Sequence, residues 1–67
     1  MEQKYFRVVK NYPNGRKDIL MCSFGPTDDN GVFEEITKWN VIEAVKKSGI
    51  TYIFQQFLDE KEYDKLK

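Results

Sequence analysis

The chain has 67 residues, of which 40% are hydrophobic and 33% charged, and its 11 basic and 11 acidic residues cancel to a formal net charge of zero. This composition predicts a single small folded domain over residues 1–67, and it excludes wholesale disorder and a global attraction to nucleic acid or membranes. One cysteine and no histidine exclude an internal disulfide and a tetrahedral zinc site. We therefore expect no metal or other cofactor, no membrane association and a reducing, cytoplasmic location.

Two β-prone runs on either side of Pro13-Asn14-Gly15 predict an N-terminal β-hairpin, with strands at about residues 4–12 and 16–24. A two-residue Asn-Gly turn would place Pro13 at a paired position, where its missing N–H loses a ladder hydrogen bond. We therefore expect a three-residue loop, in which Pro13 and Asn14 form a type I turn and Gly15 is left-handed.

This loop fixes the register of the hairpin. The predicted pairs on one face run from a polar tip to an apolar base: Tyr12 with Arg16, Lys10 with Asp18, Val8 with Leu20, and Phe6 with Cys22. The pairs on the other face are Val9 with Ile19, Arg7 with Met21, and Tyr5 with Ser23.

Residues 25–31 carry the local signals of a loop, and residues 32–36 are interpreted as a possible short third strand. An amphipathic helix follows at about residues 38–48. Its apolar residues Trp39, Val41, Ile42 and Val45 share one arc, with Glu43 and Lys47 on the opposite side.

The ends of this helix have their own signals. Thr37 and Asn40 are alternative starts, and Asn40 has capping-box spacing to Glu43. Gly49 suits a left-handed stop, with Ile50 as its apolar contact.

The last segment has two interpretations. We favour a strand at about 51–57 followed by a short C-terminal helix at about 60–66, because Asp59 and Glu62 form another capping box. The spacing of Ile53, Phe54, Phe57 and Leu58 also fits the alternative, one long helix over 51–66.

The predicted fold class is therefore α+β, with a small antiparallel sheet that starts with the N-terminal β-hairpin. The order hairpin, helix, strand resembles the start of the ubiquitin-like β-grasp. That resemblance is topological, and it transfers no functional residue because no motif of the family matches.

The sequence predicts no enzyme and therefore no catalytic residue. Cys22 pairs with Phe6 on the apolar face, as expected of a small buried hydrophobe. Asp28, Asn30 and Gly31 have part of the spacing of a calcium loop, but Pro26 and Thr37 occupy two of its ligand positions, so we interpret the segment as a solvated turn. Clustered carboxylates near the C-terminus alternate with lysines, as on a solvated helix.

Ten aromatic residues are more than a core of this size can hide. We assign Phe6, Trp39, Phe54 and Phe57 to the core, and expect others at a protein-binding surface. The candidate protein-binding residues are Tyr5, Arg7, Tyr12, Arg16, Phe24, Phe33 and Tyr52.

We accordingly expect a non-enzymatic protein-binding or regulatory module that self-associates or binds a larger protein. Nine lysines against two arginines suit a low-GC bacterium or one of its phages. For a phage or mobile element, an accessory protein that modulates a host protein is the most economical hypothesis. The alternative is a single-stranded nucleic-acid-binding protein that uses the basic, aromatic hairpin. Its candidate residues are Tyr5, Arg7, Lys10, Tyr12, Arg16 and Lys17.

Overall fold

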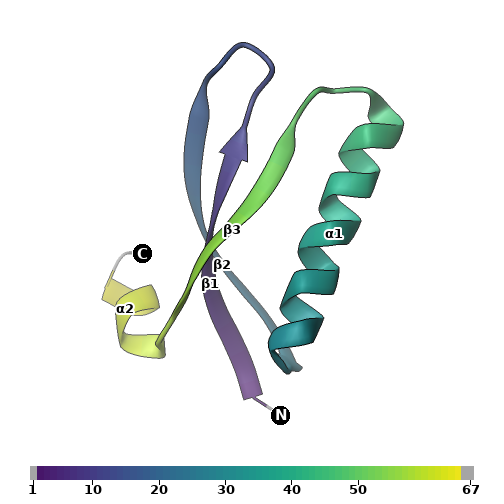
Figure 1. Cartoon of the computed structure of the whole chain (residues 1–67). Helices are drawn as coiled ribbons and strands as arrows, with labels where there is room; N and C mark the ends of the chain where they lie inside the picture. Colours follow the sequence, from purple (N-terminus) through teal and green to yellow (C-terminus); the bar gives the residue numbers. More distant parts are fainter. Residues whose placement is uncertain (1, 66–67) are drawn as a thin grey trace.

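Three antiparallel strands and two helices form the structure, a computed structural model that describes residues 2–65 (Figure 1). In chain order the elements are β1 (Glu2–Asn11), β2 (Lys17–Thr27), α1 (Asp29–Lys46), β3 (Thr51–Leu58) and α2 (Glu60–Lys65). The strand order is β2-β1-β3, so the N-terminal strand is central. The α+β class and the order hairpin, helix, strand are confirmed. Residue 66 of the predicted C-terminal helix lies outside the described residues.

The hairpin has the predicted loop and register. The Tyr12 N–H donates to the Arg16 carbonyl at 2.8 Å, and the Gly15 N–H donates to the Tyr12 carbonyl at 3.1 Å. Gly15 has a φ of 89°, the left-handed conformation expected after a type I turn. Along the strands Phe6 pairs with Cys22, and the other predicted pairs are confirmed as well.

Two expectations for residues 25–36 are wrong. Residues 25–27 belong to β2, and α1 begins at Asp29, so there is neither a loop over 25–31 nor a strand over 32–36. The helix starts early because Asp28 Oδ1 accepts a hydrogen bond from the Gly31 N–H at 2.9 Å, which makes Asp28 the N-cap. Gly31 also lets the first turn lie against the end of β2, since a Cβ there would overlap the Thr27 hydroxyl.

The predicted buried arc of the helix is also wrong. Val32 and Ile36 are the buried residues of α1, and Trp39 packs beside them. Glu43 continues this inward side, with only 12% of its side chain exposed. Val41, Ile42 and Val45 therefore point to solvent, because the early start turns the buried stripe away from them.

The hydrophobic core lies between α1 and one face of the sheet. Phe6 and Val8 of β1 and Val32 and Ile36 of α1 are its buried residues. Seven partly buried residues pack around these four: Leu20, Cys22, Phe24, Trp39, Tyr52, Phe54 and Phe57. Of the four aromatic residues assigned to the core from the sequence, Phe6 is buried and the other three belong to this surrounding layer.

Asn40 fastens α1 to the outer edge of β3, in the middle of the helix rather than at its start. The Asn40 Nδ2 donates to the Tyr52 carbonyl at 2.9 Å, and the Asn40 Oδ1 accepts from the Tyr52 N–H at 2.7 Å. β3 is an edge strand, so its unpaired backbone groups are open to another chain. The Asn40 amide occupies two of them as a neighbouring strand would.

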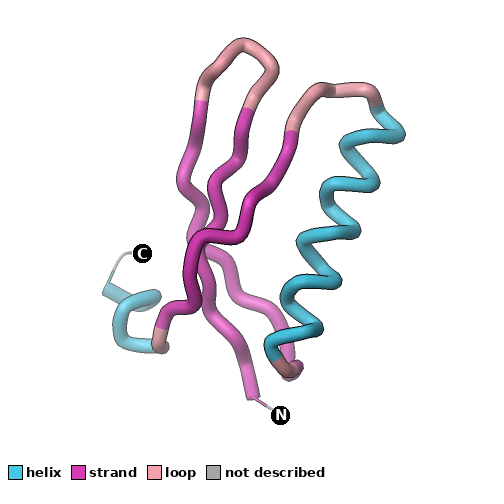
Figure 2. Tube along the Cα trace, in the orientation of Figure 1, coloured by secondary structure: helices cyan, strands magenta, loops and turns pink. Residues whose placement is uncertain are grey.

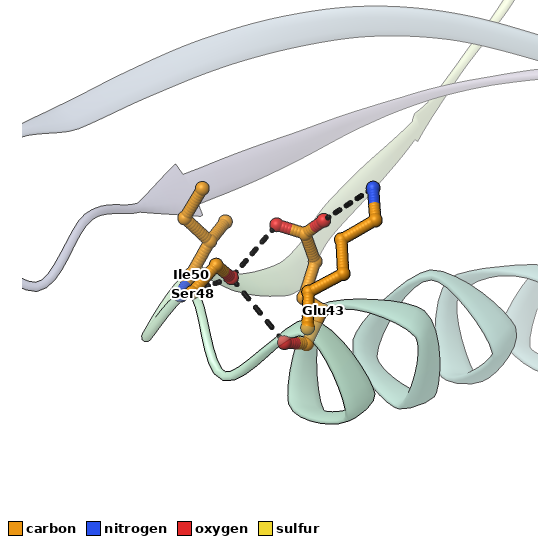
Figure 3. A network of polar contacts seen from close by, with 4 residues as sticks. Glu43, Ser48 and Ile50 are labelled. Atoms are coloured by element: carbon orange, nitrogen blue, oxygen red, sulfur yellow. Dashed lines mark hydrogen bonds and ion pairs between the residues drawn. The ribbon is translucent and has the colours of Figure 1, made fainter.

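The C-terminal stop of α1 falls at Lys47 rather than at Gly49. Lys47 has a φ of 56°, and its N–H donates to the Ala44 carbonyl. Ser48 then closes the end (Figure 3), because its hydroxyl bonds the Glu43 carbonyl and carboxylate and accepts from the Ile50 N–H.

Gly49 is left-handed as well, with a φ of 79°, and it serves the following loop. A Cβ at Gly49 would lie 2.9 Å from the Pro13 Cβ. The two loops at the same end of the molecule therefore touch (Figure 2).

A bulge in β3 explains why its sequence is ambiguous. Arg7 pairs with Gln56 and Val8 with Phe54, so Gln55 is an extra residue. Phe54 and Phe57 consequently share the core face although three positions separate them, a spacing that imitates a helix. The strand is confirmed, and the alternative of one helix over 51–66 is wrong.

α2 is a separate short helix. Asp59 Oδ1 accepts from the Glu62 N–H at 2.7 Å, as the predicted capping box requires. Its Tyr63 packs on Tyr5, which puts α2 on the face of the sheet opposite to α1 (Figure 1).

We expect Asn40→Ala to lower the free energy of unfolding by about 1–3 kcal/mol, because both hydrogen bonds to Tyr52 are lost and these groups are partly buried. Chemical denaturation would measure the change. Thr37→Ala is the matched control, since the Thr37 hydroxyl bonds only the Phe33 carbonyl within the exposed turn. Equal effects of the two substitutions would contradict the role given to Asn40.

We expect Lys47→Gly to raise the free energy of unfolding by about 1 kcal/mol, because a left-handed conformation is strained for lysine and not for glycine. Thermal and chemical denaturation would measure it. Lys46→Gly changes the last residue of the helix, which has helical backbone, and should lower stability. A destabilised Lys47→Gly variant would show that the lysine side chain matters more than its backbone conformation.

Candidate functional site

The structure separates the candidate binding residues of the hairpin onto two faces of the sheet. Tyr5, Arg7 and Lys17 belong to the face on which α2 lies, because side chains alternate along a strand. Lys10 and Tyr12 share the α1 side with Phe6 and Val8, and Arg16 lies over the Tyr12 ring. The six residues of the nucleic-acid alternative therefore do not form one continuous surface.

A cluster of rings and charges occupies the hairpin tip on the α1 side. The Lys10 Nζ lies 5.0 Å from the Tyr12 ring centroid and 5.7 Å from that of Tyr52. The Tyr12 hydroxyl donates to Asp18 Oδ2 at 2.9 Å, and the Arg16 Nε is 3.5 Å from Asp18 Oδ1. The interaction with the Tyr12 hydroxyl is the main cause that raises the pKa of Lys10. The groups of this cluster largely satisfy one another.

Tyr5 is half buried beneath α2. Its ring centroid is 4.8 Å from that of Tyr63. Removal from solvent, and then the nearby carboxylates Glu60 and Asp64, raise the pKa of the Tyr5 phenol. Leu58, its cross-strand neighbour, is buried on this face. These residues form a small second apolar cluster.

Arg7 lies at the border between α2 and the bare part of the sheet. Its Nε is buried and has no hydrogen-bond partner among residues 2–65. The shallow hollow around it is lined by Gln56, Leu58, Glu62 and Lys65.

The remaining aromatic candidates mostly complete the core. Phe24 and Tyr52 are partly buried against it. Phe33 is 42% exposed, and its ring meets those of Phe54 and Phe57 edge to face, at centroid distances of 5.0 and 5.8 Å. Phe33 is therefore the most accessible aromatic residue of the predicted protein-binding set.

Sequence reasoning missed a surface that we call the α1 outer face: Val41, Ile42 and Val45. These side chains are 57%, 51% and 77% exposed. Their helical spacing was visible in the sequence and was assigned to the core. The sequence holds a second apolar stripe, Val32, Ile36 and Trp39, at spacings of four and three. A helix that buries this stripe leaves Val41, Ile42 and Val45 exposed.

A second apolar surface lies on the other side of the sheet, and we call it the open sheet face: Val9, Ile19, Met21 and Ile53. Val9 of the central strand pairs with Ile19 on one side and with Ile53 on the other. Ile19 and Ile53 are 59% and 56% exposed. The predicted hairpin register already placed Val9, Ile19 and Met21 together, but only the structure shows that α2 leaves them uncovered.

Groups with chemical reactivity are few in the part of the chain that the structure describes. Burial raises the pKa of the Cys22 thiol, which lowers the fraction of reactive thiolate at neutral pH. No three acidic, cysteine or histidine side chains among residues 2–65 gather in a way that would hold a metal ion. The same residues contain no helix with the length and apolar character needed to cross a membrane.

A hollow of about 610 Å³ opens between the start of β1 and α2. Tyr5, Phe57 and Leu58 form its apolar wall, and Lys4, Asp29 and Glu60 contribute charges. The Lys4 Nζ is 3.1 Å from Asp29 Oδ1, so these two charges already neutralise each other.

No protein-family model, curated protein or solved structure matches this chain.

Proposed function

We propose that this protein is a non-enzymatic protein-binding module that contacts a larger protein through the α1 outer face. The carrying observation is the exposure of Val41, Ile42 and Val45 on one side of a helix whose other side already serves the core. Covering an aliphatic side chain of this size contributes about 1.5–3 kcal/mol when burial is complete. Three such residues side by side form an exposed apolar patch of the kind found at protein-binding surfaces.

The charges around the α1 outer face define the partner further. Lys38, Lys46 and Lys47 are exposed at the C-terminal half of α1. Of these three lysines, Lys46 is the one that forms an ion pair within residues 2–65, with Glu43 Oε1 at 3.6 Å. A fitting partner therefore presents an apolar strip bordered by carboxylates, because opposite charges at a rim steer and orient association.

The candidate binding residues proposed from the sequence would lie at the edge of the contact that the α1 outer face makes with the partner. Phe33 and Arg16 are exposed, whereas Tyr5, Arg7, Tyr12, Phe24 and Tyr52 are only partly accessible. We propose a regulatory role in which this small domain acts on a larger protein by occupying part of its surface. A bacterial or phage accessory protein in the cytoplasm is the setting that we propose.

We expect Val45→Asp to abolish capture of the partner, because it places a carboxylate in the centre of the α1 outer face. Immobilised wild-type protein and variants would be incubated with lysate, and the captured proteins identified by mass spectrometry. Gln3→Asp is the control, an exposed position at the start of β1. A partner retained by Val45→Asp and Val41→Asp alike, with circular dichroism showing both folded, would refute this binding surface.

The alternative, single-stranded nucleic-acid binding, is favoured by one observation, the gathering of Lys10, Tyr12, Arg16 and Tyr52 at the hairpin tip. Fluorescence anisotropy with a labelled single-stranded oligonucleotide tests it. We expect no binding at about 20 mM salt, where phosphate contacts are strongest. Binding that weakens steeply with salt and with Arg16→Ala and Lys17→Ala would transfer the function to the hairpin.

A further inference from the structure

We propose that the open sheet face is the interface of a symmetric homodimer. Two copies pack this face against each other about a two-fold axis that runs across the strands near Val9. This surface lies on the opposite side of the sheet from the α1 outer face, so the proposal goes beyond the partner proposed above and does not rest on it.

The shape of the face is self-complementary. α2 covers the end of the face near Tyr5 and Arg7, and the other end, up to the hairpin loop, is bare (Figure 1). The face is therefore stepped: α2 raises the surface over Tyr5, and the surface over Val9 and Ile53 is lower because no helix covers it. A two-fold rotation that reverses the strand direction puts the raised α2 of each copy next to the low half of the other.

The low half supplies an apolar centre. Ile19, Val9 and Ile53 form a continuous cross-strand row, with Met21 beside Ile19. Two such rows facing each other across about 10 Å pack as the inner faces of two sheets do. Because a two-fold interface brings the same patch together from both copies, an apolar row at the axis meets an apolar row.

The two ends of the face carry opposite charges. Lys17 lies at the hairpin end and pairs with Asn11, two residues beyond Val9 on the same face. α2 lies at the other end, with the exposed carboxylates Glu60, Glu62 and Asp64 against the exposed Lys61 and Lys65, so this helix carries one net negative charge. Reversing the strands sets Lys17 of one copy against α2 of the other, twice per dimer, whereas a parallel arrangement would bring α2 against α2.

The overall charge does not oppose this association. The formal net charge of the chain is zero, so two copies have no long-range repulsion to overcome. Only five hydrophobic residues among residues 2–65 are buried: Phe6, Val8, Val32 and Ile36 in the core, and Leu58 on the α2 side of the sheet. A chain with so small a core gains stability when a second copy covers further apolar surface.

Size-exclusion chromatography with multi-angle light scattering tests the interface. We expect a dimer for the wild type, and a monomer for Ile53→Asp and Ile19→Asp. Val45→Asp is the matched control: it places a carboxylate at a more exposed aliphatic residue of the α1 outer face, and it should remain dimeric. Circular dichroism would establish that all variants are folded.

A charge-reversal experiment tests the orientation. Lys17→Glu, and separately Glu60→Lys with Glu62→Lys, should each weaken the dimer by roughly tenfold in Kd, since each change makes both ends repulsive. Mixing the two variants should restore a heterodimer, because every contact then joins opposite charges again. Native mass spectrometry would resolve the heterodimer from the parent chains.

Three results would overturn the proposal. The first is a wild type that stays monomeric at about 0.5 mM, a concentration at which even weak specific interfaces form. The second is a dimer that Val45→Asp dissociates and Ile53→Asp does not. The third is a mixture of the charge variants that stays as weak as its components. The first and third results leave capture of a larger partner untouched, because that capture is measured separately with Val45→Asp, whereas the second would make the α1 outer face the self-association surface.

Discussion

α1 is the one helix among residues 2–65 that is long enough to cover a face of the three-stranded sheet. This constraint determines which apolar side chains the molecule exposes. A sheet has two faces, and each apolar face needs a covering layer. α1 covers one face and buries Phe6 and Val8 between itself and the sheet. α2 has only six residues and reaches no farther than the Tyr5 end of the other face. The row from Ile19 to Ile53 is what remains uncovered.

Contacts at two points along α1 determine which side of this helix packs against the sheet. Asp28 and Gly31 fix where the helix starts. The Asn40 amide, bonded to both backbone groups of Tyr52, then fixes its rotation against β3. With both in place, the side of Val32 and Ile36 faces the sheet, and Val41 and Val45 face away. The same bonds that complete the core therefore create the α1 outer face.

The sequence was informative where local geometry decides the outcome. Pro13 excludes the shorter turn, and the resulting register of the hairpin agrees with the structure along its length. The cap at Asp59 is a similar case, because one side chain and one N–H suffice to define it. Both follow from backbone chemistry within a few residues.

Prediction failed where two local signals competed and a distant contact chose between them. Asp28-Asp29-Asn30-Gly31 suits a turn and a helix start equally well, and the helix prevails because Val32 and Ile36 find Phe6 and Val8 to pack against. Asn40 has the spacing of a cap, but its partner is Tyr52, twelve residues away. The bulge at Gln55 hides the alternation of β3. The exposed surfaces depended on these choices, so the candidate site was harder to predict than the fold.

The two apolar surfaces differ in ways that suit different partners. The α1 outer face lies on a single helix, and of the lysines beside it Lys46 forms an ion pair whereas Lys38 and Lys47 form none within residues 2–65, which fits a partner of different composition. The open sheet face carries a cation at one end and carboxylates at the other, and it is stepped between them. Such a surface is complementary to itself in charge and in shape. A second copy of the chain can therefore cover it without any other protein. Both surfaces have the same origin: a fold that is too small to bury all the aliphatic side chains that its elements carry.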